Sequence, residues 1–206
     1  MGEKFLLISG NVEQSSWSMR AWLMLKMTGV SFETKFIDLS LVDYKSKILE
    51  YTLAGKVPAL VHNDLHIWES LAIGEYLNEL FPNINLYPGD LKERAIARSL
   101  ANEMHAGFIN IRSTMPFTLS QQNSYNGSPE LQKEIERVEF IWTSQRSKYQ
   151  NLGKFLFGGF SLVDAMFAPI VIRFAKYGYV SNSETVLKYS KSVLEHPFVK
   201  EWMQKQ

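Results

Sequence analysis

Residues 4–28, KFLLISGNVEQSSWSMRAWLMLKMT, decide the fold because an apolar strand is followed at once by an amphipathic helix. The segment KFLLIS predicts a buried strand over residues 4–9. Behind it, residues near the spacing of helical turns predict a helix over residues 16–28: Trp17, Ala21, Met24 and Met27. A strand that leads directly into a helix is typical of an α/β fold.

The same alternation continues along the chain. FETKFIDL (32–39) has a partial two-residue period, and a polar helical segment follows around residues 43–52. VPALVHNDLHIWES (57–70) contains two short strands joined by a turn at Asn63-Asp64, and ESLAIGEYLNELF (69–81) predicts a helix. Right-handed crossovers make the first strands parallel, whereas the tight turn makes the last pair antiparallel. We therefore expect an α/β domain of thioredoxin type over residues 1–81.

The rest of the chain is predicted to be all-helical. The Pro-, Asn- and Gly-rich run FPNINLYPGD indicates a linker, which we place at residues 82–91. Apolar residues at helical spacing predict one long helix that runs to about Met115, and Ser128-Pro129 begins a second helix. GGFSLVDAMFAPI (158–170) begins a third, with Ser161 and Asp164 as a capping box rather than a catalytic pair. Two shorter helices, near 183–192 and 195–204, complete a helical-bundle domain over residues 92–206.

Composition excludes several kinds of function. The chain has 206 residues, 46% of them hydrophobic, and a formal net charge of +1 without any block of like charges. These values are typical of a globular protein and indicate neither nucleic-acid binding nor a polybasic membrane patch. The apolar stretch 165–180 is interrupted by Pro169, Arg173 and Lys176, so it predicts a buried helix rather than a membrane span. We expect a cytoplasmic protein.

Cysteine is absent from the sequence. The chain therefore has no disulfide, no thiolate metal site and no cysteine nucleophile of its own. His62 and His66 have the spacing of a helical zinc pair, but they fall in the predicted hairpin. We expect no metal site.

Two adjacent serines, Ser15 and Ser16, stand where the first helix begins, just after the first strand. A helix N-terminus stabilises anions through its partial positive charge and its unpaired N–H groups. Ser15 and Ser18 also have the spacing of the two sulfurs in a thioredoxin-type C-x-x-C. A hydroxyl cannot exchange disulfides, but it can donate a hydrogen bond to the thiolate of another molecule. Taken alone, these serines are better explained as helix caps.

Two further stretches carry chemistry of the same kind. In GKVPAL (55–60), the Val57-Pro58 bond enters a strand, and a cis peptide there would turn the backbone groups of Val57 toward an extended peptide. In WESLAIGEYL (68–77), Glu69 and Ser70 begin a helix and together suit an α-amino acid head group. An ordinary trans proline and a simple helix cap are the alternatives.

SSWSMRAWL, GKVPAL and ESLAIGEYL, in this order, resemble the glutathione transferase superfamily. The resemblance covers essentially the whole chain, including FLFGGFSLVDA and the closing HPF…W. It is closest to serine-type bacterial members similar to the zeta class. It implies an enzyme that activates the thiolate of glutathione, its co-substrate, for attack on a small electrophile. It also implies a homodimer. From the composition and the residues themselves, we expect no metal and neither nucleic acid nor membrane as a partner.

The resemblance also implies roles for individual residues. Ser15 matches the serine that hydrogen-bonds the glutathione sulfur, and Ser16 is the second choice. The residues matched to glutathione itself are Val57 with Pro58 for the cysteinyl backbone, Glu69 and Ser70 for the γ-glutamyl group, and Lys56 for the glycyl carboxylate, with Lys45 or Lys47 as a looser alternative. We expect the second substrate between the domains, near His105, Ile109, Arg112, Met115 and Phe117.

Other functions stay open at this point. Trp17 stands where zeta-class isomerases have Cys, which argues against maleylacetoacetate isomerase activity in particular. A glutathione-dependent cis-trans isomerase of that type is nevertheless an alternative, and so is a non-catalytic glutathione transferase-like binding module. The absence of Cys excludes thiol–disulfide exchange of the glutaredoxin or omega kind.

Overall fold

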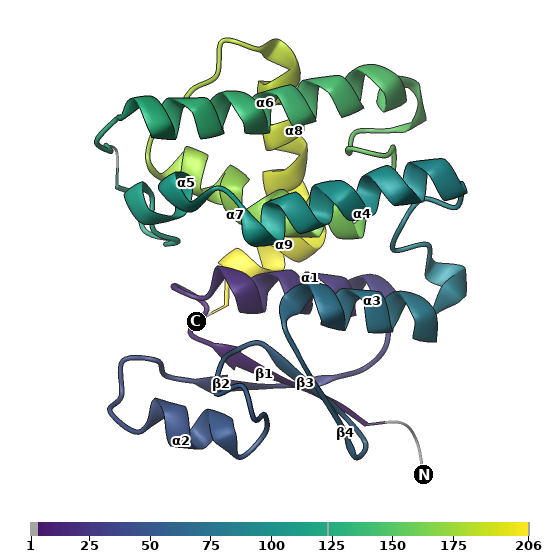
Figure 1. Cartoon of the computed structure of the whole chain (residues 1–206), viewed down its shortest axis with the longest axis vertical. Coiled ribbons are helices and arrows are strands. Elements are labelled where there is room, and N and C mark those ends of the chain that lie inside the picture. The colour runs from purple at the N-terminus through teal and green to yellow at the C-terminus, as the bar shows by residue number, and fades with distance from the viewer. Residues whose placement is uncertain (1–3, 123, 206) are drawn as a thin grey trace. The chain divides into compact units, whose positions relative to one another are not determined.

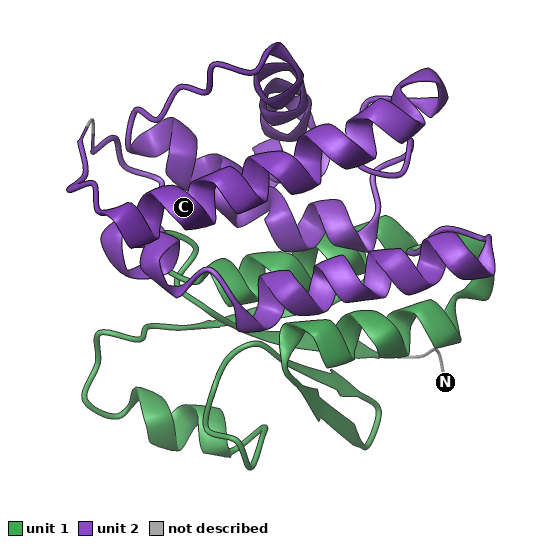
Figure 2. Ribbon diagram, turned by 45° about the horizontal axis from the view of Figure 1, so that its top comes forward, with its two compact units in different colours: residues 1–86, 204–206 green, residues 87–203 purple. Residues whose placement is uncertain are grey.

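The structure is a computed structural model that describes residues 4–122 and 124–205 (Figure 1). The chain divides into two compact units (Figure 2). Unit 1 extends as far as Leu86 and includes the last residues from Gln204, whereas unit 2 comprises Tyr87–Met203. The boundary between the units falls inside the stretch 82–91.

Unit 1 is built on a four-stranded sheet in the order β2-β1-β3-β4. Its elements are β1 (Phe5–Gly10), α1 (Ser16–Thr28), β2 (Glu33–Ile37), α2 (Tyr44–Leu49), β3 (Ala59–His62), β4 (Leu65–Trp68), α3 (Ser70–Leu80) and the 3₁₀ turn η1 (Pro82–Ile84). Strand β1 is parallel to β2 and antiparallel to β3, and β4 is antiparallel to β3. This arrangement confirms the thioredoxin-like expectation.

The sheet of unit 1 separates its helices, with α1 and α3 together on one face and α2 on the other (Figure 1). Because side chains alternate along a strand, β1 supplies both faces. Ile8 belongs to a small cluster on the α2 side with Ile37, Ile48 and Ala59. The helix α1 is almost entirely buried, with Met19, Leu23 and Leu25 at 0% exposure. Strand β1 and helix α1 thus form a rigid core beneath the turn between them.

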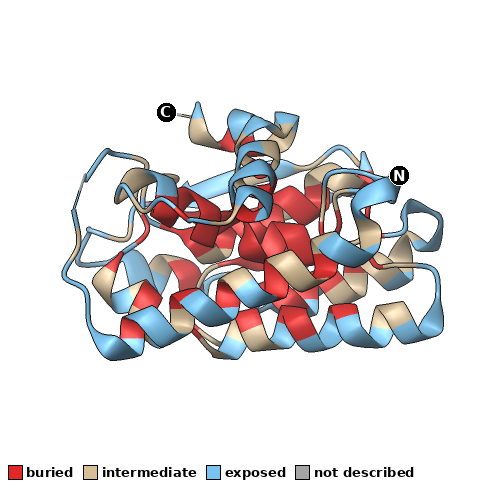
Figure 3. Ribbon diagram, turned by 90° about the horizontal axis from the view of Figure 1, so that it is seen from above, coloured by how far each residue is buried: buried red, intermediate tan, exposed pale blue. Residues whose placement is uncertain are grey.

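Unit 2 is helical. Its helices are α4 (Leu91–Ala106), α5 (Ile109–Thr114), α6 (Pro129–Tyr149), α7 (Leu162–Lys176), α8 (Glu184–Glu195) and α9 (Pro197–Met203), with a 3₁₀ turn η2 (Gln150–Leu152) after α6. Every residue of α7 from Leu162 to Phe174 is buried. Figure 3 shows the buried residues of the chain in red. None of the helices in the described residues is both long enough and apolar enough to cross a membrane.

The predicted long helix that runs to Met115 is wrong, because the structure divides it into α4 and α5. Gly107 is extended, and Phe108 adopts a left-handed conformation with φ 59°. Phe108 is thereby 5% exposed and makes an edge contact with Phe167. Burial of an aromatic ring stabilises the fold by about 2 kcal/mol or more, which offsets the cost of one left-handed residue.

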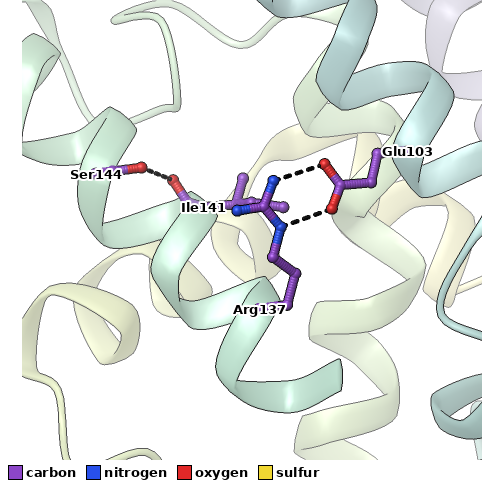
Figure 4. A network of polar contacts seen from close by, with 4 residues as sticks. All are labelled: Glu103, Arg137, Ile141 and Ser144. Atoms are coloured by element: carbon purple, nitrogen blue, oxygen red, sulfur yellow. Dashed lines mark hydrogen bonds and ion pairs between the residues drawn. The ribbon is translucent and has the colours of Figure 1, made fainter. Parts of the chain in front are cut away.

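Polar contacts fix the helices of unit 2. Arg137 of α6 donates two hydrogen bonds to the Glu103 carboxylate of α4, at 2.7 and 2.9 Å (Figure 4). The capping box of α7 is confirmed, with Asp164 accepting from the Ser161 N–H and hydroxyl at 2.9 and 2.6 Å. Burial raises the pKa of the Asp164 carboxyl, against the opposing effect of these hydrogen bonds.

Candidate active site

The turn between β1 and α1 is held from both sides. The Asn11 carbonyl accepts from the Ser15 N–H at 2.9 Å, and the Asn11 side chain binds both Asp38, at 3.0 Å, and the Leu39 N–H, at 2.8 Å. The Asn11 hydrogen bond, followed by those from Ser40, lowers the pKa of Asp38 to about 2. The ends of the parallel strands β1 and β2 are thereby joined. Ser15 therefore stands on a fixed backbone.

Ser15 is the N-cap of α1, and its Oγ accepts from the Ser18 N–H at 3.3 Å. Ser15 therefore caps α1, as one of the two interpretations of the sequence predicted. Capping does not exclude a catalytic role, because the cap uses the Ser15 oxygen as an acceptor, while its hydroxyl hydrogen donates to the Ser18 Oγ at 2.8 Å and can rotate toward a ligand. The first turn of α1 carries no acidic side chain, so the positive end of the helix is not neutralised from within that turn.

Three segments converge at Gly10, the last residue of β1. A Cβ on Gly10 would lie 3.0 Å from the Ser15 Cβ and 3.1 Å from the Val57 Cγ2. The Val57–Pro58 peptide bond is cis, so the structure excludes the alternative of an ordinary trans proline. Ser15 and Val57, which are far apart in the sequence, therefore both lie next to Gly10.

The N-terminus of α3 has an unusual backbone. Glu69, the residue before the helix, is exposed and has φ 70°, a left-handed conformation that non-glycine residues rarely adopt. Ser70 is fully buried, and its Oγ has no hydrogen-bond partner within the described part of the chain. A buried hydroxyl without a partner costs free energy that a bound ligand can recover. Strained backbone and unpaired hydroxyl together indicate a ligand position.

Two lysines lie in or beside the loop between α2 and β3. Lys56 is exposed, and the Lys45 side chain approaches this loop, its Cε lying 3.5 Å from where a Gly55 Cβ would be. Lys47 instead forms an ion pair of 2.9 Å with Asp43. Of Lys45 and Lys47, Lys45 is therefore the one whose side chain lies beside the loop that contains Lys56.

Trp17 follows the serine pair on α1 and lies against Arg20. The Arg20 guanidinium carbon is 4.3 Å from the centre of the Trp17 ring, and Arg20 is 0% exposed. Such a contact stabilises the cation by about 0.5–2 kcal/mol. Arg20 therefore supports the helix end that carries the serines.

The residues expected near the second substrate all lie around the α4–α5 break in unit 2. Ile109 is 65% exposed, and His105 is half-buried. Arg112 donates to the carbonyls of His105, at 3.4 Å, and of Gly107, and burial lowers the pKa of Arg112. Met115 and Phe117, by contrast, have buried side chains.

The roles of Gly10, Asn11 and Asp38 were not predicted from the sequence. Asn11 directly after a glycine at a strand end is a turn signal, which could have indicated its backbone role. Its side-chain link to Asp38 joins residues 27 positions apart and has no local signal.

Comparison with known proteins is consistent with this geometry. The family "Glutathione S-transferase, N-terminal domain" matches residues 14–80. The chain is 30% identical over 198 residues to a probable glutathione S-transferase of Glycine max, covering 91% of this chain and 83% of that protein. It is 28% identical over 186 residues to a probable maleylacetoacetate isomerase of Caenorhabditis elegans, covering 89% and 86%.

Solved structures show the same fold. A glutathione transferase homologue from Burkholderia, with bound glutathione, aligns with a TM-score of 0.70 at 24% identity, covering 98% of this chain and 96% of the other.

Proposed function

This chain belongs to the glutathione S-transferase family, and we propose that Ser15 activates the thiolate of glutathione for attack on a small electrophile. Ser15 would donate a hydrogen bond to the sulfur at the N-terminus of α1. The observation that carries this assignment is the position of Ser15, which caps a helix whose first turn lacks an acid and which lies beside Gly10 and Val57. Ser16, at the next position, remains the second choice.

Lowering the pKa of the glutathione thiol requires only a modest free energy. A free thiol has a pKa near 8.5, and lowering it by about two units requires ~2.7 kcal/mol of preference for the anion. A hydrogen bond to a charged group supplies about 1.5–3 kcal/mol, and a helix terminus supplies about 0.3–1 kcal/mol. Ser15 and the end of α1 together therefore suffice.

The reaction then proceeds at the sulfur. The thiol proton leaves to solvent, and the sulfur lone pair forms a bond to the electrophilic carbon. In a substitution, the leaving group departs with the bonding electron pair; in an addition, the adjacent carbon takes up a proton. Holding the two reactants together supplies much of the remaining rate enhancement.

The rest of the glutathione molecule would be held by the matched residues. Ser70 would bind the γ-glutamyl carboxylate through its unpaired hydroxyl and the backbone N–H groups of α3, while Glu69 accepts from the ammonium. Val57 would pair through its backbone with the cysteinyl part. Lys56, with Lys45 beside its loop, would attract the glycyl carboxylate. For the second substrate, Ile109 and His105 are the exposed or half-exposed candidates.

Calorimetry at pH 7 tests the assignment, with glutathione titrated into the wild type, Ser15→Ala and Ser16→Ala in buffers of different ionisation enthalpy. We expect the wild type to bind and release a proton, Ser15→Ala to bind without proton release, and Ser16→Ala to resemble the wild type. Proton release lost only in Ser16→Ala would transfer the role to Ser16. No binding by the wild type would refute the proposal.

A glutathione-dependent cis-trans isomerase is a second candidate, supported by the similarity to the isomerase of Caenorhabditis elegans along 86% of its length. In that reaction, the sulfur adds to the double bond and is later expelled. An assay with a maleyl-type substrate distinguishes the two activities, because isomerisation consumes no glutathione. Detoxification of electrophiles in the cytoplasm is the physiological role that we propose for the transferase activity.

We also propose that the chain forms a homodimer. Unit 1 exposes apolar side chains in and around α2: Leu41 at 45%, Val42 at 103%, Leu49 at 47% and Leu53 at 89%. Neighbouring exposed apolar residues favour association. Sedimentation equilibrium would give twice the mass of 23.7 kDa if this proposal is correct.

A further inference from the structure

Ser18 is hydrogen-bonded to Ser15 through both its hydroxyl and its backbone N–H. The Ser15 hydroxyl donates to the Ser18 Oγ at 2.8 Å, and the Ser18 N–H donates back to the Ser15 Oγ at 3.3 Å. The Gly10 N–H donates to the Ser18 Oγ at 3.0 Å. Ser18 is 0% exposed and Ser15 is 5% exposed. Ser18 thus has no direct access to a ligand but touches the residue that does.

The direction of the hydrogen between the two hydroxyls matters. Each hydroxyl has one hydrogen and two lone pairs. If Ser15 donates to Ser18, then Ser18 accepts twice, and its own hydrogen has no acceptor in the part of the chain that the structure describes. If Ser18 donates to Ser15 instead, the Ser18 hydroxyl both donates and accepts a hydrogen bond. Only the Ser15 hydrogen then lacks an acceptor in the described residues, and a ligand can supply one.

A thiolate is such an acceptor. Because hydroxyl hydrogens rotate freely, the approach of an anion to Ser15 favours the second arrangement. A continuous chain then runs from the Gly10 N–H through the Ser18 and Ser15 hydroxyls to the sulfur. Each donor in such a chain polarises the next, and burial strengthens the effect. The Gly10 N–H belongs to the end of β1, so the chain starts from a fixed point.

We propose that Ser18 is a positioning residue that directs the Ser15 hydrogen toward the thiolate and strengthens its hydrogen bond. The inference rests on the proposed function, since it requires that Ser15 binds the sulfur. No proton leaves either serine. The thiol proton still departs to solvent, and the role of Ser18 is to fix which way the Ser15 hydroxyl points.

The test compares Ser18→Ala with Ser9→Ala. Ser9 is the matched control because it is also 0% exposed and its Oγ also contacts Gly10, donating to the Gly10 carbonyl at 2.8 Å, without a bond to Ser15. The apparent pKa of the bound thiol is measured for each variant in two ways. One is the ultraviolet absorbance of the thiolate, and the other is the pH dependence of kcat/KM for the electrophile at saturating glutathione.

We expect Ser18→Ala to raise the apparent pKa of bound glutathione by about one unit. At pH values below that pKa, kcat/KM then falls about tenfold, whereas it recovers at high pH. The KM for glutathione is unchanged, and Ser9→Ala follows the wild-type profile. A conservative variant, Ser18→Cys, retains the volume with a weaker donor and gives an intermediate shift. It also serves if Ser18→Ala does not fold.

Other outcomes separate this inference from the proposed function. A wild type that binds glutathione without forming thiolate would contradict the proposed function itself. A wild type that forms thiolate, with Ser18→Ala and Ser18→Cys matching its pH profile, would overturn only the role of Ser18. Equal shifts in Ser18→Ala and Ser9→Ala would likewise overturn it, because a general disturbance around Gly10 would then explain both.

Discussion

Gly10 and Ser15 are so close that a methyl group on Gly10 would lie 3.0 Å from the Ser15 Cβ. The same methyl group would lie 2.7 Å from the Leu39 Cδ1. Gly10→Ala must therefore displace its neighbours, and overpacking of this kind costs about 1–3 kcal/mol. We predict a lower free energy of unfolding, measured by urea denaturation, together with a raised pKa of the bound thiol.

Gly89→Ala is the control for this substitution, because a Cβ on Gly89 would have no atom of the described residues within 4 Å. Its free energy of unfolding should differ little from that of the wild type. If both alanine variants unfold at the wild-type urea concentration, then the close approach at Gly10 does not constrain the turn.

Ser70→Ala should separate stability from ligand binding. In the free protein, the Ser70 Oγ is buried without a partner in the described residues, so its removal leaves the free energy of unfolding unchanged or slightly raised. Glutathione loses a hydrogen bond to its carboxylate, worth about 1.5–3 kcal/mol, so Kd rises by about 10- to 100-fold. Calorimetry and urea unfolding measure the two effects. A large loss of stability with unchanged Kd would identify Ser70 as a purely structural residue.

The sequence was most informative where local patterns and tertiary structure agree. The predicted helix over residues 16–28 coincides with α1 (Ser16–Thr28), because its capping serine and its apolar spacing both mark the same boundaries. The α4–α5 break was not predictable in this way. The apolar spacing continues through Gly107 and Phe108, and only the burial of the Phe108 ring against Phe167 explains the left-handed turn.

In the candidate site, too, local sequence patterns predicted some features, whereas others depend on tertiary packing. Motifs at Ser15, Val57-Pro58 and Glu69-Ser70 were visible in the sequence, since each lies at the start of a helix or strand. The proximity of Ser15 to Val57 depends on how both residues pack against Gly10. Whether the Ser70 hydroxyl finds a hydrogen-bond partner among the described residues depends on the tertiary structure that surrounds it. Neither property is encoded within a few neighbouring residues.

Asp164→Ala is predicted to be strongly destabilising. The Asp164 carboxylate accepts hydrogen bonds from the Ser161 N–H and hydroxyl, from the Leu156 N–H at 3.0 Å and from the Tyr189 hydroxyl at 3.1 Å. The alanine variant leaves these buried donors unpaired, at about 1–3 kcal/mol for each donor that finds no water. We expect a loss of at least about 3 kcal/mol in the free energy of unfolding.

The control for that loss is Asp164→Asn, whose amide oxygen retains part of the acceptor capacity. It should unfold at a denaturant concentration between those of the wild type and the alanine variant. Two variants of equal stability would mean that the hydrogen bonds contribute little beyond the space that the side chain fills.

His196 predicts a pH dependence of stability. Its ring stacks on Phe160 at 3.8 Å between centroids, and its Nδ1 is buried without a hydrogen-bond partner in the described residues. Burial lowers the pKa of His196 from 6.5. The unfolded chain therefore binds a proton at a higher pH than the folded chain does. Stability is full above the unfolded pKa and decreases as the pH falls from about 6.5 through the folded pKa.

His196→Phe should remove this dependence while keeping the aromatic contacts with Phe155, Phe160 and Phe198. The measurement is the free energy of unfolding of both proteins at pH 7.5, 6.5 and 5.5. All other titratable groups are common to both proteins, so the difference between them isolates His196. The wild type should lose stability relative to the variant as the pH falls, because only the wild type has the His196 imidazole, which the unfolded state protonates more readily. A constant difference across this range would show that the buried ring titrates as it does in the unfolded chain.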